Sequence, residues 1–331
     1  MSPPDHHRPG GGFRNPWPSA ELHGFLDFLK WSLVERRRHP RPPDPDPATF
    51  VRTDSAFAFP RASPDQFTVT WVGHSSFLIQ LAGLNVLTDP MWSERASPVQ
   101  FAGPRRWVPP GIEFDRLPPI DVVVQSHDHY DHLDSNTVSR IAERYPAIVW
   151  YAPLGVAAFL KQRGAREITE LDWWQEGSIG GLQLACVPAQ HFSGRSIGRR
   201  NGTLWAGWTL RSPSHSMFFA GDTALHPDFG AIDERHGPFD LAILPIGAYE
   251  PRWFMGAVHM NPEDCMDAFA QLERGQNGHP LRVVGAHWGT FKLTDEPMDE
   301  PPAKMRRLWE EAGYPRNDLW ILRHGETRYV G

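Results

Sequence analysis

Four apolar stretches of this 331-residue chain each run into a histidine or an aspartate. Residues 120–126 lead into His-Asp-His-Tyr-Asp-His at 127–132, and residues 182–188, 217–221 and 281–286 are closely followed by His191, Asp222 and His287. The stretches have the length of β-strands, and strand ends at one edge of a sheet lie close together. The pattern therefore favours a fold that gathers these side chains at one edge.

The hexapeptide at 127–132 is itself a metal-binding pattern. Side chains alternate along an extended backbone, so His127, His129 and Asp131 can point the same way, with His132 just beyond the bend. Imidazole nitrogen and carboxylate oxygen suit a pair of Zn²⁺ ions, although they also suit Fe and Mn. A solvated histidine-rich loop is the alternative, and the ligand candidates downstream argue against it.

Composition limits the classes of function. A hydrophobic content of 40% supports one large core or two small ones. The net charge of -6 offers no polyanion-binding surface, so nucleic acid is not an expected partner. Cys186 and Cys265 are expected as buried free thiols rather than a disulfide framework. Without a secretory pattern or an apolar run of roughly 20 residues, we expect a cytoplasmic protein, with peripheral membrane association left open.

Residues 1–60 differ in composition from residues 61–331. Proline is dense at 39–49, which favours an extended linker. Before it, apolar residues at helical spacing predict a helix over about 19–37, with Ser19 as N-cap and arginines 36–38 near its end. This N-terminal arm either packs on the body or lies on a membrane surface with its apolar face and basic end.

Residues 61–331 are expected to form one domain in which strand and helix patterns are interspersed. We expect helices near residues 135–145, 154–163, 226–236, 262–274 and 302–312. We expect strands near residues 67–72, 77–81, 85–88, 120–126, 147–151, 182–188, 203–210, 215–220, 240–246 and 281–286. The pattern indicates an α/β (α+β) protein with two packed sheets and helices outside.

These motifs resemble those of the metallo-β-lactamase superfamily, whose signature is His-x-His-x-Asp-His followed by a later His, Asp and His. The resemblance runs from about Thr70 to about Gly313 and is closest to N-acylphosphatidylethanolamine-hydrolysing phospholipase D and its bacterial relatives. The motif at 126–134 is specific to the superfamily, and Tyr-Glu-Pro-Arg-Trp at 249–253 is specific to this branch. Residues 1–60 do not match well, so a membrane-docking part of the family is not carried over there.

The resemblance implies a four-layer αββα sandwich that holds two zinc ions per chain. It implies one zinc on His127, His129 and His191, the other on Asp131, His132 and His287, and Asp222 as a bridge. A bridging carboxylate and hydroxide offset the repulsion between two cations about 3.5–4 Å apart. Water bound there has a pKa of roughly 7 instead of about 15.7, so hydroxide exists at neutral pH.

The implied activity is that of a zinc phosphodiesterase of phospholipase D type. It would hydrolyse the phospholipid N-acylphosphatidylethanolamine to phosphatidic acid and N-acylethanolamine through the metal-bridging hydroxide. One alternative is a soluble hydrolase of another ester, such as a lactone or a small phosphodiester, because fold and metal site do not fix the substrate. A metal-stabilised lipid-binding protein without turnover is a third hypothesis. It needs a defect in the ligand set, and the sequence shows none.

Three residues are the catalytic candidates, namely Asp222, Asp131 and His259. The resemblance places His259 at the substrate phosphate or as a proton donor to the leaving group, and it places Arg195 near the phosphate. For both, an ordinary structural role stays open.

Further candidates surround the centre. Tyr130 must point away from its two ligand neighbours and is expected at the mouth of the cleft, and Trp253 belongs to aromatic loops expected to seat acyl chains. Asp89 either accepts the second N–H of a ligating imidazole or caps a turn. His74 either contacts a ligand or packs in the core. The oligomeric state is open, a homodimer included.

Overall fold

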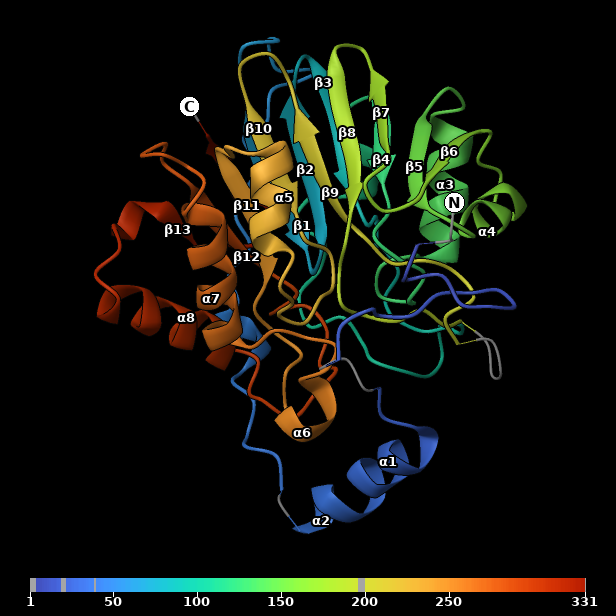
Figure 1. Cartoon of the computed structure of the whole chain (residues 1–331), viewed down its shortest axis with the longest axis vertical. Helices are drawn as coiled ribbons and strands as arrows, with labels where there is room; N and C mark the ends of the chain where they lie inside the picture. The colour runs from blue at the N-terminus through green and yellow to red at the C-terminus, as the bar shows by residue number, and fades with distance from the viewer. Residues whose placement is uncertain (1–3, 19–21, 39, 196–199, 331) are drawn as a thin grey trace.

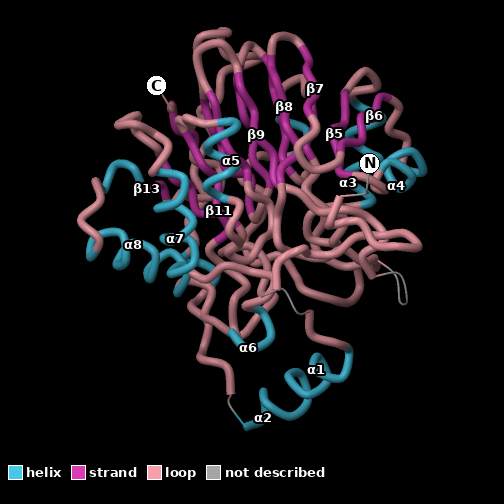
Figure 2. Tube along the Cα trace, viewed as in Figure 1, coloured by secondary structure: helices cyan, strands magenta, loops and turns pink. Residues whose placement is uncertain are grey.

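Two β-sheets packed face to face form the centre of the computed structural model, which describes residues 4–18, 22–38, 40–195 and 200–330 (Figure 1). The strand orders are β14-β1-β2-β3-β4-β5-β6 and β13-β12-β11-β10-β9-β8-β7. Helices lie on the outer face of each sheet (Figure 2). The expected four-layer αββα sandwich is therefore confirmed.

The first sheet comes from the N-terminal half of the body and one C-terminal strand. Its strands are β1 (Thr68–Gly73), β2 (Ser76–Leu81), β3 (Leu84–Thr88), β4 (Val122–Val124), β5 (Val149–Pro153), β6 (Glu167–Leu171) and β14 (Thr327–Tyr329). Strands β1 to β3 pair antiparallel, and β3 to β6 run parallel. Helices α3 (Ser135–Arg144) and α4 (Ala157–Gln162) cover its outer face.

The second sheet repeats this arrangement. Its strands are β7 (Glu176–Ile179), β8 (Leu182–Val187), β9 (Gly207–Arg211), β10 (Ser216–Phe219), β11 (Leu241–Pro245), β12 (Arg282–Ala286) and β13 (Leu319–Trp320). Strands β7 to β10 pair antiparallel and β10 to β13 run parallel. Its outer face is covered by α5 (Phe229–His236), α7 (Pro262–Glu273) and α8 (Glu300–Glu311). Each half thus presents parallel strands whose carboxyl ends lie at one edge.

Alternation along the strands builds the layers. In β2, Phe77 and Ile79 enter the core between the sheets, whereas Leu78 packs outward against the helices. In β11, Leu241 belongs to the central core and Ala242 to the outer one. Successive side chains of a strand point to opposite faces, so a strand buried on both faces reads as a continuous apolar run.

Four strands were not predicted, and they share a cause. β6, β7, β13 and β14 are the edge strands of the two sheets, and β7 and β14 have little buried surface. Glu167 and Glu176, at the starts of β6 and β7, are exposed. An exposed edge strand lacks the apolar pattern that reveals a buried one. The four-residue helix α6 (Arg252–Met255) was also missed.

The predicted N-terminal helix begins later than expected. It consists of α1 (Phe25–Leu29), the π-helix η1 (Lys30–Glu35) and α2 (Arg36–Arg38), and Ser19 lies outside the described residues. This arm sits at the lower end of the molecule, beside α6 (Figure 1). Trp31 anchors it in an apolar cluster with Met255 and Val258. Among the described residues, no helix is both long and apolar enough to cross a membrane.

Candidate metal centre

The seven side chains expected to bind metal lie together beyond the ends of β4, β8, β10 and β12. The Nε2 atoms of four imidazoles lie between 3.0 and 3.7 Å from Oδ2 of Asp222, and they belong to His127, His132, His191 and His287. Asp222 is only 3% exposed. Strands from both sheets therefore deliver ring nitrogens to a single buried carboxylate.

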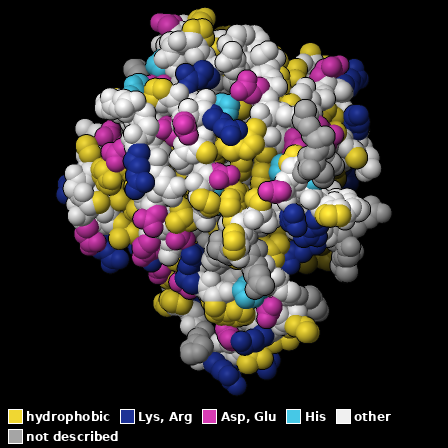
Figure 3. Space-filling view, viewed as in Figure 1, with side chains coloured by type: hydrophobic (Ala, Val, Ile, Leu, Met, Phe, Trp, Pro, Cys, Tyr) yellow, Lys and Arg dark blue, Asp and Glu magenta, His cyan; other side chains and the backbone are white. Residues whose placement is uncertain are grey.

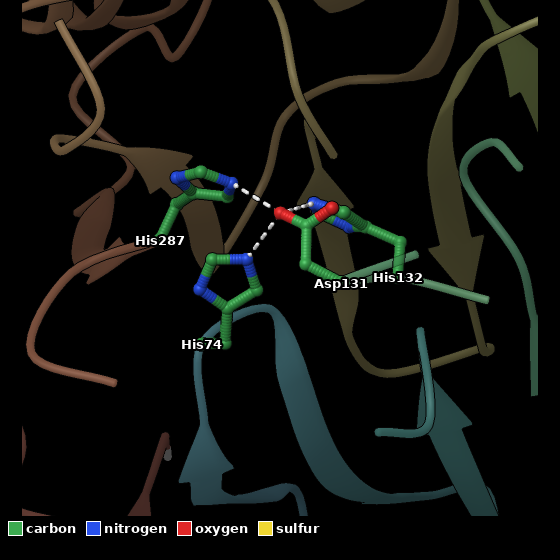
Figure 4. A group of neighbouring side chains, drawn as sticks. All are labelled: His74, Asp131, His132 and His287. Atoms are coloured by element: carbon green, nitrogen blue, oxygen red, sulfur yellow. Dashed lines mark hydrogen bonds and ion pairs between the residues drawn. The ribbon is translucent and has the colours of Figure 1, made fainter. Parts of the chain in front are cut away.

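The ligand atoms form two neighbouring groups. The first consists of His127, His129, His191 and Asp222, and the second of His74, Asp131, His132 and His287, and within each group the ligand atoms lie within 4.8 Å of one another. Figure 4 shows the second group, in which Asp131 is surrounded by three imidazoles. Nε2 of His74 lies 2.9 Å from Oδ2 of Asp131, so His74 contacts a candidate ligand and does more than pack.

Hydrogen bonds fix the tautomers of two of these histidines. Nδ1 of His191 lies 2.8 Å from the Val258 carbonyl, and Nδ1 of His132 lies 2.7 Å from Oδ2 of Asp89. A carbonyl or carboxylate oxygen only accepts, so each Nδ1 carries a proton, and Nε2 is the ring nitrogen left to bind a metal. The Asp89 carboxylate therefore accepts the second N–H of a candidate ligand, which is one of the two roles expected for it.

The buried polar atoms of the centre fit metal ions. Nε2 of His132, Nε2 of His287 and Oδ1 of Asp222 are buried without a hydrogen-bond partner among the described residues. Nδ1 of His129 lies 2.9 Å from Nε2 of His127 and 3.1 Å from Nε2 of His191. Buried polar atoms normally have a partner, and cations that accept these lone pairs would supply one. Imidazole and carboxylate are ligands that zinc binds.

The protonation states of the first group also suit metal binding. Burial lowers the pKa of His129 to about 3 and that of His191 to about 4, and it lowers the pKa of His127 well below 6.5. Burial would raise the pKa of the Asp222 carboxyl, but attraction to His132 and His287 lowers it well below 3.8. Neutral imidazoles and an ionised carboxylate are the forms that bind metal. At His132 and His287 burial would likewise lower the pKa, but Asp222 and Asp131 raise it above 6.5, so a metal ion there must displace a proton.

A cavity of about 690 Å³ opens over the centre. Tyr130 and His259 line it, together with His129, Asp131 and Asp222. Its other walls are mainly apolar and come from the arm, from the loop after His191 and from the α6 region, namely Phe28, Trp31, Phe192, Phe254, Met255 and Val258.

Two expected substrate contacts do not line this cavity. The Arg195 guanidinium donates to the backbone carbonyls of Asp128 and Leu133, at 2.8 and 2.6 Å, and so holds the metal-motif loop. The indole of Trp253 donates to Glu35 of the arm at 2.8 Å, whereas the next residue, Phe254, faces the cavity. Among the described residues, the arginine that lines the cavity is Arg200, which the sequence did not single out.

We expect the metal-free protein to lose stability as the pH rises from 6.5 to about 9. Burial disfavours the charged form of His287, but Asp222 and Asp131 outweigh it and raise its pKa from 6.5 to about 9. The folded chain then binds more protons than the unfolded chain in that window, so this stabilisation is complete below 6.5 and is lost as the pH rises through about 9.

Zinc should flatten this dependence, because it replaces the proton on His287. Melting temperatures measured across the window, with chelator and with zinc, check this expectation. Equal pH slopes under the two conditions would contradict it.

Asp89→Asn should weaken zinc binding by about 10- to 100-fold, as loss of a hydrogen bond to a ligand commonly does. Asp89 accepts from the Ser126 backbone, the Ser126 hydroxyl and Gln125 besides His132, and an amide has one acceptor oxygen for these donors. Chelator competition measures the affinity. The matched control is Asp121→Asn, because Asp121 lies before β4, at the opposite end of that strand. An unchanged zinc affinity in Asp89→Asn would show that Asp89 does not support a zinc ligand.

Known proteins are similar to this chain in sequence and in fold. The chain matches the family described as "Beta-lactamase superfamily domain" over residues 84–288. An uncharacterized protein of Mycobacterium tuberculosis is 42% identical over 284 residues, which cover 85% of this chain and 72% of the relative. N-acyl-phosphatidylethanolamine-hydrolyzing phospholipase D 1 of Caenorhabditis elegans is 40% identical over 252 residues, which cover 73% of this chain and 69% of the relative.

A solved structure agrees with the fold. Igni18, a metallo hydrolase of Ignicoccus hospitalis, superposes with a TM-score of 0.59 at 22% identity and covers 80% of this chain and 98% of its own. At that identity the likeness shows the fold alone. The chain belongs to the β-lactamase superfamily and is a metal-dependent hydrolase with the metallo-β-lactamase fold.

Proposed function

We propose that this hydrolase is a two-zinc phosphodiesterase of phospholipase D type, which converts N-acylphosphatidylethanolamine into phosphatidic acid and N-acylethanolamine. The observation that carries the proposal is the mostly apolar cavity of about 690 Å³ directly over the His/Asp centre. Such a cavity suits a lipid whose acyl chains are apolar and whose reacting group is a phosphodiester. The C. elegans relative, 40% identical, carries this activity in its name.

Two groups of side chains would hold the zinc ions. His127, His129 and His191 form one group, and Asp131, His132 and His287 form the other, with Asp222 within reach of both. Bound zinc would supply a hydroxide nucleophile near neutral pH and would polarise a phosphoryl oxygen. The chain itself fixes the ligand tautomers through Val258 and Asp89.

Arg200 is the cation that we propose for the substrate phosphate, in place of Arg195. Its guanidinium lies 4.4 Å from the centroid of the Phe192 ring, and it donates one hydrogen bond of 2.7 Å to the His23 carbonyl at the cavity wall. A guanidinium has several donors in a planar fork, so further donors can bind phosphate oxygens.

His259 is the second proposed contact to the reacting group. It is 6% exposed and lines the cavity, and its Nδ1 has no hydrogen-bond partner among the described residues. Its ring lies 4.9 Å from that of His191 and 5.1 Å from that of His287. The Arg252 guanidinium donates a hydrogen bond of 2.9 Å to the backbone carbonyl of His259. A fixed imidazole beside both candidate metal groups can hydrogen-bond an oxygen of the phosphodiester.

The arm is the part of the chain that we propose to contact a phospholipid surface. Leu26 and Leu33 are 79% and 54% exposed, although the opposite side of the same helical segment is anchored by Trp31. Arg37 and Arg38 follow at its end and are exposed, whereas Arg36 pairs with Asp295 at 3.0 Å. Figure 3 shows hydrophobic and basic side chains side by side at this end of the molecule. An apolar face with a basic border is typical of a helix that lies on anionic lipid.

Incubation with N-acylphosphatidylethanolamine in mixed micelles tests the activity. We expect the zinc-loaded protein to release phosphatidic acid and N-acylethanolamine in equal amounts by mass spectrometry. In ¹⁸O-labelled water the label should enter the phosphatidic acid, because water attacks phosphorus. Asp222→Ala serves as the inactive control. Release of fatty acid, or turnover of a lactone with none of the lipid, would overturn the proposal in favour of another ester.

Leu26→Glu/Leu33→Glu should lower activity on phosphatidic-acid-containing vesicles severalfold and leave activity on detergent-dispersed substrate near wild type. Phe59→Glu is the matched control, because Phe59 is 72% exposed and the adjacent Pro60 contacts Asn85 near the start of β3, the end of that strand away from the metal centre. Vesicle sedimentation and rate measurements check both. An equal loss of activity on vesicles and on micelles would contradict the proposed membrane contact of the arm.

A further inference from the structure

We infer that Asn15, far from the metal motif in sequence, is a positioning residue for His191. The inference rests on the proposed metal centre, in which His191 is a ligand. Asn15 lies 176 residues before His191 and belongs to an N-terminal segment, residues 4–18, that precedes α1. No feature of the sequence gave this segment a part in the reaction.

The Asn15 side chain forms hydrogen bonds with both the carbonyl and the N–H of His191. Its amide Nδ2 donates to the His191 carbonyl at 2.8 Å, and its Oδ1 accepts from the His191 N–H at 3.2 Å. Among the described residues, these are the hydrogen bonds that the His191 backbone makes. His191 is fully buried, so both groups need partners.

Asn15 takes the place that a neighbouring strand would otherwise fill. His191 lies beyond the last residue of β8, Val187. The preceding residue, Gln190, is still tied to the second sheet, because its N–H donates to the Thr223 hydroxyl at 2.9 Å and its carbonyl accepts from Ala224 at 2.8 Å. At His191 this pairing ends, and a side-chain amide supplies the donor and the acceptor instead.

The imidazole is fixed separately from the backbone. Nδ1 is held by the Val258 carbonyl at 2.8 Å, and Nε2 lies 3.7 Å from Oδ2 of Asp222. With the ring held at one end and the main chain at the other, the position of Nε2 is determined. A ligand that drifts by even about 0.5 Å binds its metal less well.

The segment has enough other anchors that Asn15 is not needed merely to attach it. Rings of His6 and His7 lie 2.7 and 2.8 Å from the two carboxylate oxygens of Asp172, and His6 stacks on Trp173 with centroids 4.2 Å apart. Phe13 is buried in the central core, and its N–H donates to the Asn201 carbonyl at 2.9 Å. These contacts hold the segment without Asn15. Besides the His191 N–H, Asn15 Oδ1 accepts from the Trp205 indole at 3.1 Å, and that indole also donates to the Ala189 carbonyl at 2.8 Å.

Cobalt binding by the full chain tests the inference without relying on turnover. Cobalt at a histidine and carboxylate site has a visible spectrum that reports ligand geometry. We expect Asn15→Ala to alter that spectrum and to lower the affinity for Co²⁺ and Zn²⁺ by about tenfold, in the range of other residues that orient a ligand. Asn15→Asp keeps the acceptor and loses the donor, so it should weaken binding as well.

Two control variants separate positioning from attachment. Phe13→Ala removes a buried anchor of the segment and should lower the melting temperature without changing the cobalt spectrum. Asn317→Ala alters an exposed asparagine and should change neither. If both Asn15 variants keep the wild-type spectrum and affinity, the inference is overturned, whatever their melting temperatures. If the wild-type chain binds no cobalt or zinc, the proposed metal centre itself fails.

Discussion

The contact between the Asp222 carboxylate and four imidazoles is the interaction on which the rest of the centre depends. Its Oδ2 meets ring nitrogens from the loop after β4, the loop after β8 and the end of β12, at 3.0 to 3.7 Å. Burying a carboxylate costs free energy unless it is paired with a positive charge. Nitrogen lone pairs that point at the carboxylate therefore need cations between them and its oxygens. The two sheets satisfy this requirement because each presents strand ends at the same edge.

The convergence of the candidate ligands could be predicted because their signal is local. Each candidate ligand follows a strand that is buried on both faces and therefore has an apolar sequence. The hexapeptide at 127–132 places several candidates within six residues. The tautomer-fixing contact of Asp89 was foreseen as one of two roles for the same reason. The edge strands β7 and β14 were not foreseen, because an exposed strand loses that pattern.

Side-chain direction in the loops could not be predicted. Arg195 and Arg200 lie in one loop, yet the first binds backbone carbonyls of the metal-motif loop and the second lines the cavity. Trp253 and Phe254 are neighbours in the short helix α6, and of these two only Phe254 lines the cavity. The contact of Asn15 with His191 spans 176 residues and exists only in the folded chain. Residues 1–60 therefore supply both a cavity wall and a contact to a candidate ligand, although composition sets them apart.

Anomalous X-ray diffraction from crystals of the zinc-loaded protein, collected on both sides of the zinc absorption edge, tests the central claim most directly. We expect two zinc peaks, one bound by His127, His129 and His191 and one by Asp131, His132 and His287, with the Asp222 carboxylate bound to both. A single peak, or two peaks of which neither contacts Asp222, would contradict the account.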